Sequence, residues 1–69
     1  MPEILPQQKL LLELLVMSGQ IGVAAEAQDT ILWRTLVECQ AAGWLTRVEV
    51  NPGLFSIEIT QKGRRAIEA

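Results

Sequence analysis

The chain has 69 residues, which suffices for one domain at most, and we expect that domain to cover residues 1–69. Its single cysteine excludes an intrachain disulfide, and the absence of histidine excludes a Cys/His zinc site. Eight acidic side chains against six basic ones give a net charge of −2, which argues against a nucleic-acid module but leaves room for a local basic patch.

The N-terminal residues Met1-Pro2-Glu3 lack the basic segment that is typical of signal peptides. The longest apolar segment, Leu10–Met17, is far shorter than the ~20 residues that span a bilayer. We therefore expect a cytoplasmic protein without membrane contact. A core this small contributes only about 3–5 kcal/mol, and 49% of the residues are apolar. Oligomerisation is the remaining source of stability, so we expect a homodimer or a protein partner, with the leucine-rich helix near the N-terminus or the last helix as the dimer surface.

Two helices are predicted before residue 29. The first covers residues 6–18, with Pro6 in its first turn and Gly19 as its C-terminal cap. Leu11, Leu14 and Leu15 fall on one face of this helix. The following segment fits a short extended piece at residues 21–23 or a short helix over residues 23–27, and we predict the short helix.

The next helix is predicted to run from Ile31 to Ala42, with Asp29 or Thr30 as its N-terminal cap and Gly43 at its end. Its inward stripe consists of Leu32, Leu36 and Cys39.

A β-hairpin and a last helix are predicted in the C-terminal third. Residues 45–50 and 54–60 alternate in polarity and are rich in β-branched side chains, and Asn51-Pro52-Gly53 between them has turn chemistry. Thr60 is expected to cap a helix over about residues 61–68, in which Gly63 allows close approach to neighbouring backbone. Trp44 and Cys39 are expected in the core.

Two motifs in this order resemble the winged helix-turn-helix domains of bacterial transcription regulators, in the broad MarR- and PadR-like style. The motif LVECQAAGWLTR matches at Leu36, Cys39, Gly43, Trp44 and Leu45, and the motif FSIEITQKGRRAI matches at Ile57, Ile59, Thr60, Gly63 and Ile67. The resemblance covers about residues 6–68. It implies an α+β winged-helix fold: a three-helix core, a two-stranded β-hairpin wing and a C-terminal helix.

The resemblance implies a small DNA-binding regulator whose third helix enters the major groove of duplex DNA. The matching polar positions on this helix are Thr30 and Arg34, and Arg47 lies at the root of the wing. The densest basic cluster is Lys62, Arg64 and Arg65. Non-DNA interpretations remain open for these residues: pairing of Arg34 with Glu38, pairing of Arg47 with Glu58, and a solvated end of the last helix.

The sequence departs from the family at Ile31, Trp33 and Val37, which are apolar where polar side chains are usual, and the wing tip has no Lys or Arg. This departure supports the alternative of a protein–protein interaction module on the same scaffold that does not bind DNA, with these three residues as its interface and Trp33 as its anchor unless it is buried in the core. We expect no enzymatic activity, no cofactor and no metal.

Overall fold

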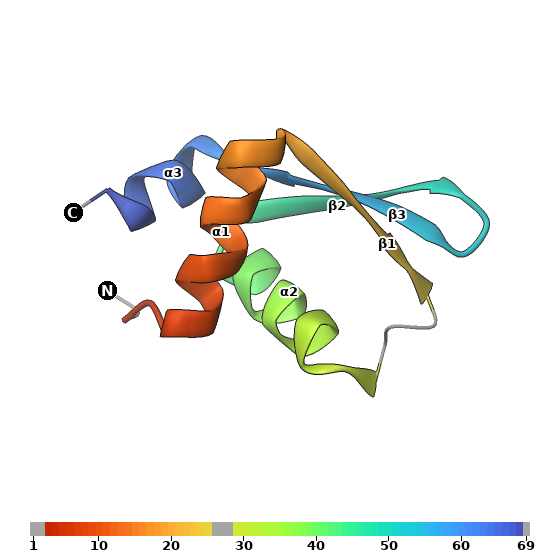
Figure 1. Cartoon of the computed structure of the whole chain (residues 1–69), viewed down its shortest axis with the longest axis horizontal. Coiled ribbons are helices and arrows are strands. Elements are labelled where there is room, and N and C mark those ends of the chain that lie inside the picture. The colour runs from red at the N-terminus through yellow and green to blue at the C-terminus, as the bar shows by residue number, and fades with distance from the viewer. Residues whose placement is uncertain (1–2, 26–28, 69) are drawn as a thin grey trace.

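The computed structural model describes residues 3–25 and 29–68. Its elements follow in the order α1 (Pro6–Ser18), β1 (Gln20–Ala24), α2 (Ile31–Ala41), β2 (Leu45–Asn51), β3 (Leu54–Ile59) and α3 (Gln61–Ile67) (Figure 1). The three strands form one antiparallel sheet in the order β1-β3-β2. The described part of the chain is therefore an α+β structure with three helices and a three-stranded sheet.

Helix α1 has the predicted bounds. The side chain of Gln8 accepts a hydrogen bond from the backbone N–H of Leu5 at 2.9 Å, which satisfies one donor before the first turn. At the other end Gly19 has φ of 82°, and its N–H donates to the carbonyl of Leu15 at 2.8 Å. Only glycine takes this conformation without strain, so the helix ends there.

The short second helix was predicted wrongly where the structure can test it, because Gln20–Ala24 is the strand β1. In this strand Ile21 lies opposite Ile57 and Val23 lies opposite Phe55 of β3. Of the other predicted positions, Ala25 donates its backbone N–H to the carbonyl of Gly53, and 26–27 lie outside the described residues. The local sequence offered two alternating apolar residues on either side of a glycine, and the pairing with β3 makes them extended.

The predicted hairpin is present as β2 and β3, but its sheet has three strands and not two. Gly53 in the connecting turn has φ of 80°, as the turn chemistry predicted. Its carbonyl accepts a hydrogen bond from the N–H of Ala25 at 2.8 Å, which ties the turn to the end of β1. Strand β3 therefore lies in the centre of the sheet, with β1 and β2 at its edges.

The core lies where α1 and α2 pack against the sheet. Its buried apolar side chains are Leu11, Leu12, Leu15, Val23, Leu36, Cys39, Trp44, Leu45 and Ile57. The predicted burial of Trp44 and Cys39 is thus confirmed. Leu32 was predicted to face inward and Leu14 to share the face of Leu11 and Leu15, but Leu14 and Leu32 are 43% and 46% exposed. The apolar arc of each helix is wider than the surface that the core covers.

Helix α3 is fixed to the turn after α2. The hydroxyl of Thr60 accepts from the N–H of Gly63 at 3.0 Å and donates to the carbonyl of Gly43 at 2.7 Å. The N–H of Thr60 donates to the carbonyl of Trp44 at 2.9 Å. Gly63 is buried against Trp44, where a Cβ atom would overlap the carbonyl oxygen. The predicted cap and the predicted close approach at Gly63 are both confirmed.

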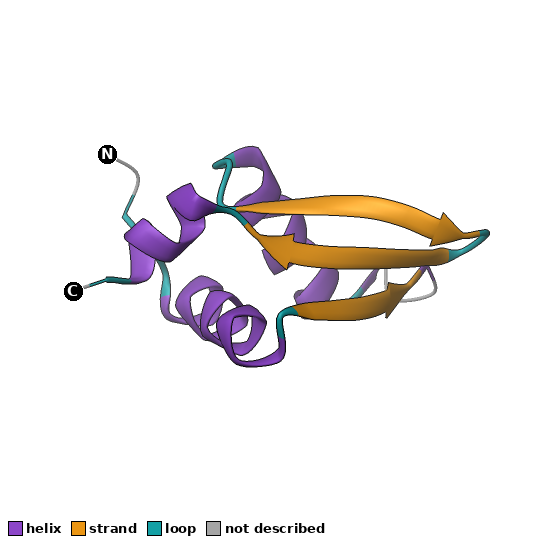
Figure 2. Cartoon of the chain, turned by 90° about the horizontal axis from the view of Figure 1, so that it is seen from above, coloured by secondary structure: helices purple, strands orange, loops and turns teal. Residues whose placement is uncertain are grey.

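The molecule measures 36 × 22 × 17 Å along its principal axes. Viewed from above, the helices gather toward one end and the strands extend to the other (Figure 2). Among the described residues, no helix has the length and the hydropathy needed to cross a membrane.

Candidate functional site

The outward side of α2 carries few groups that bind nucleic acid. Thr30 caps the helix, since its hydroxyl oxygen accepts from the N–H of Trp33 at 3.2 Å. The exposed side chains of the following turns include Arg34, Val37 and Glu38. A single arginine therefore faces solvent on this side of α2, four positions before an acidic residue.

Arg47 forms a cluster with two aromatic side chains at the junction of α2 and the sheet. Its guanidinium carbon lies 5.1 Å from the ring centroid of Trp33 and 5.4 Å from that of Phe55. The two rings meet edge to face, with centroids 5.5 Å apart and planes at 66°. These distances are within the range of cation–π attraction. The three side chains are half-buried, so Trp33 is neither a core residue nor a free surface anchor.

The two ion pairs that the sequence left open are not formed. Arg47 lies opposite Ile57 in the ladder, and Glu58 lies opposite Thr46. Successive residues of a strand point to opposite faces, so Arg47 and Glu58 are on different faces of the sheet. The carboxylate of Glu38 accepts a hydrogen bond from the side-chain amide of Gln8 at 3.1 Å, which joins α2 to α1. The partner of Glu38 is therefore Gln8 and not Arg34.

The basic side chains of α3 lie apart from this junction. Lys62, Arg64 and Arg65 are exposed, on a helix at the end of the molecule opposite the β2–β3 turn (Figure 1). The Lys62 side chain comes within 3.5 Å of the position that a Cβ at Gly43 would take, just beyond the C-terminus of α2. Positive charge is favourable at a helix C-terminus. The predicted DNA contacts therefore fall into two groups: Thr30, Arg34 and Arg47 at the junction, and the α3 cluster.

The three predicted interface residues of α2 are also divided. Ile31 is 76% exposed and Val37 is exposed, whereas Trp33 packs against Phe55 and Arg47. Ile31 and Val37 together do not make a continuous patch with Trp33 as its centre.

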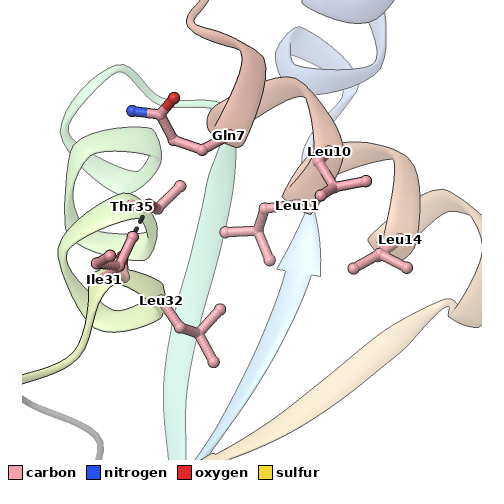
Figure 3. A pocket seen from close by; sticks show the side chains of 7 residues that line it. All are labelled: Gln7, Leu10, Leu11, Leu14, Ile31, Leu32 and Thr35. Carbon is pink, nitrogen blue, oxygen red and sulfur yellow. Dashed lines mark hydrogen bonds between the residues drawn. The ribbon is translucent and has the colours of Figure 1, made fainter.

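An apolar groove between α1 and α2 is a feature that the sequence did not reveal. It has a volume of about 170 Å³ and is lined by Gln7, Leu10, Leu11, Leu14, Ile31, Leu32 and Thr35 (Figure 3). None of these side chains is charged. The hydroxyl of Thr35 donates to the carbonyl of Ile31 at 2.8 Å, so this polar group is already bonded within the helix. The sequence signal was the width of the leucine-rich arc of α1, beyond what one core can cover.

Cys39 does not extend the chemistry of the site. Burial, followed by the negative charge of Glu38, raises the pKa of its thiol from 9.0 to about 11. A thiol with this pKa is not a nucleophile at neutral pH. Within residues 3–25 and 29–68, no group of three or more cysteine or carboxylate side chains is placed to hold a metal ion.

Comparisons with protein-family models, with curated proteins and with solved structures gave no match. The geometry of the junction and of the groove therefore carries the functional inference.

Proposed function

We propose that the chain is a small winged-helix protein that binds duplex DNA, with α2 as the helix that enters the major groove and the β2–β3 hairpin as the wing. The path of the chain supports this proposal. Helix α2 passes through the Gly43–Trp44 turn directly into β2, and α3 then closes over that turn. A helix held at a fixed angle to a hairpin is the arrangement that such docking needs.

The observation that carries the proposal is the position of two arginines close to Trp33, one its neighbour on α2 and the other over its ring. Arg34 follows Trp33 on the exposed side of α2, and Arg47 reaches the Trp33 ring from β2. Because the ring packing restricts Arg47, less side-chain entropy is lost when its guanidinium meets a phosphate. Arg34 is the candidate for a base or phosphate contact, and Arg47 for a phosphate contact.

The test is binding of the purified protein to random-sequence duplex DNA at two salt concentrations. Each phosphate contact contributes about 0.9 to the slope of log K against log salt. Replacing Arg34 and Arg47 together by Gln should therefore reduce that slope by about 1.8. Lys9→Gln removes one positive charge from the exposed side of α1 and serves as the control. An unchanged affinity and slope in the double variant would exclude this site.

Arg47 needs a second variant because it also packs on aromatic rings. Arg47→Lys keeps the charge while it loses the planar contact. If the salt slope survives in Arg47→Lys and falls in Arg47→Gln, the charge contacts phosphate. If both variants bind alike, Arg47 acts only through packing.

A second candidate function is a protein-interaction module, and the exposure of Ile31 favours it. Ile31 is 76% exposed in the first turn of α2. Its apolar side chain cannot donate a hydrogen bond to a phosphate, whereas exposed apolar side chains can serve a protein interface. The net charge of −2 and the hairpin turn without a cation point the same way. Failure of the wild-type protein to bind DNA at low salt would support this alternative.

A further inference from the structure

We propose that the groove between α1 and α2 binds a second copy of this chain, so that the protein forms a two-fold dimer through its two N-terminal helices. The inference does not depend on DNA binding. It rests on the shape and chemistry of the groove and on the surface area of the chain.

One wall of the groove is a ridge of exposed apolar side chains on α1. Leu10, Leu14 and Met17 follow at i, i+4 and i+7, which places them on one side of the helix. They are exposed although they adjoin the buried stripe of the same helix. Figure 3 shows Leu10 and Leu14 along α1 and Ile31 and Leu32 on α2, with the Leu11 side chain between the two helices. The ridge therefore borders the groove along α1.

A ridge next to a groove is complementary to its own copy. Under a two-fold axis the ridge of each copy enters the groove of the other, so both contacts form together. Spacing of i, i+4 and i+7 is also the spacing with which helices pack side by side. Since no charged residue lines the groove, it offers nothing to select an acidic or basic partner over an apolar one.

The surface area of the chain indicates how much a second copy could cover. A folded monomer of 7.6 kDa exposes about 4,300 Å² by the scaling of surface with mass. This chain exposes 4722 Å², a surplus of about 400 Å² over that expectation. The smallest specific interfaces bury about 600 Å² per partner. The surplus is thus most of what a small dimer needs, and the uncovered ridge and groove are apolar.

Stability also favours a second copy. A chain of this size gains stability from disulfides, metals or association. Cys39 is the only cysteine of the sequence and is buried, so no disulfide serves this purpose. Association through α1 and α2 would cover Leu10 and Leu14 next to the core and extend it across the two-fold axis.

The experiment is sedimentation equilibrium of the full chain, without DNA, over a wide range of protein concentration. Leu14→Glu is compared with Val16→Glu, because the two residues lie on the same helix and are 43% and 40% exposed. Of these two residues, Leu14 lines the groove and Val16 does not. We expect a reversible wild-type dimer whose Kd rises at least about tenfold in Leu14→Glu and is unchanged in Val16→Glu.

Three outcomes would overturn the proposal. One is a wild-type protein that stays monomeric over the whole range. Another is a dimer that Leu14→Glu leaves intact, which would assign association to another surface, such as the free edge of β1. The third is equal weakening by both variants. If circular dichroism shows Leu14→Glu to be unfolded, Leu10→Glu replaces it, since Leu10 is 60% exposed and contributes less to the core.

Discussion

Replacement of Gly63 by Ala should destabilise the protein, although alanine is normally the better helix residue. In the middle of a helix this change usually stabilises by about 0.8–1 kcal/mol. Here the new Cβ would overlap the carbonyl oxygen of Trp44 and lie 2.8 Å from Cγ1 of Ile59 and 2.9 Å from the Trp44 carbonyl carbon. Backbone atoms do not yield as a flexible side chain does, so α3 must shift.

The expected loss of stability is the sum of an overpacking cost and a weakened hydrogen bond. Overpacking of this kind costs about 1–3 kcal/mol, and a shift of α3 also weakens the hydrogen bond from Thr60 N–H to Trp44, which contributes about 1 kcal/mol. After the helix gain is subtracted, we expect a net loss of about 1–3 kcal/mol. In a domain of this size each kcal/mol lowers the melting temperature by about 4–8 °C.

Gly22→Ala is the matched control for this prediction. A Cβ at Gly22 would meet only Cδ1 of Leu54 at 3.7 Å, which is ordinary contact, and Gly22 has no positive φ. We expect Gly22→Ala to be neutral or stabilising by up to about 1 kcal/mol. Urea unfolding followed by tryptophan fluorescence measures both variants. If Gly63→Ala is as stable as wild type, then α3 does not pack on Trp44 as described.

Three further predictions concern side chains with defined contacts. Thr60→Val should lower the free energy of unfolding by about 1–2 kcal/mol in urea titrations, because it removes the cap of α3 and the bond to Gly43, whereas Thr60→Ser should retain both; equal losses in the two variants would contradict this. Arg47→Met should cost about 1 kcal/mol and change the tryptophan emission, because it removes the cation from two aromatic rings; an unchanged spectrum and stability would show that the contact contributes nothing. Burial raises the pKa of the Cys39 thiol from 9.0 to about 11. As the pH rises, the thiol of the unfolded chain therefore loses its proton before the thiol of the folded chain does. The contribution of Cys39 to the free energy of unfolding is complete below pH 9.0 and falls by about 1.4 kcal/mol per pH unit up to about pH 11. Cys39→Ala should lack this part of the decline, and parallel pH profiles of the two proteins would refute the assignment.

The elements with local signals were predictable from the sequence. Pro6 and Gly19 bound α1, Thr30 caps α2, and the alternation on either side of Asn51-Pro52-Gly53 gave the hairpin. Each of these features depends on interactions within a few residues. The same is true of α3, because its cap residue Thr60 accepts a hydrogen bond from the N–H of Gly63, three residues further along the chain.

The features that were missed depend on distant partners. Strand β1 is extended because it pairs with β3, whose partner residues lie 30 to 38 positions further along the chain. The exposure of Leu14 and Leu32 depends on which part of each apolar arc the neighbouring elements cover, and periodicity along one helix does not report this. The position of Arg47 on Trp33 and Phe55 depends on the ladder register, which places Glu58 on the other face of the sheet.

If both proposals hold, the small number of contacts that one copy offers couples DNA binding to self-association. A good base contact contributes about 1–3 kcal/mol of discrimination, whereas specific complexes exceed non-specific ones by about 4–10 kcal/mol. One α2 with Arg34 as its exposed cation falls short of that, and a dimer doubles the contacts. Of the groove residues on α2, Ile31 lies about a sixth of a turn and Thr35 about a quarter of a turn from Arg34 around the helix, so Arg34 lies at the edge of the surface that a docked copy would cover. Leu14→Glu should therefore weaken DNA binding although position 14 lies on α1 and not on the proposed DNA-binding helix α2, and Val16→Glu should not. If Leu14→Glu dissociates the dimer and DNA affinity is unchanged, each copy binds DNA independently.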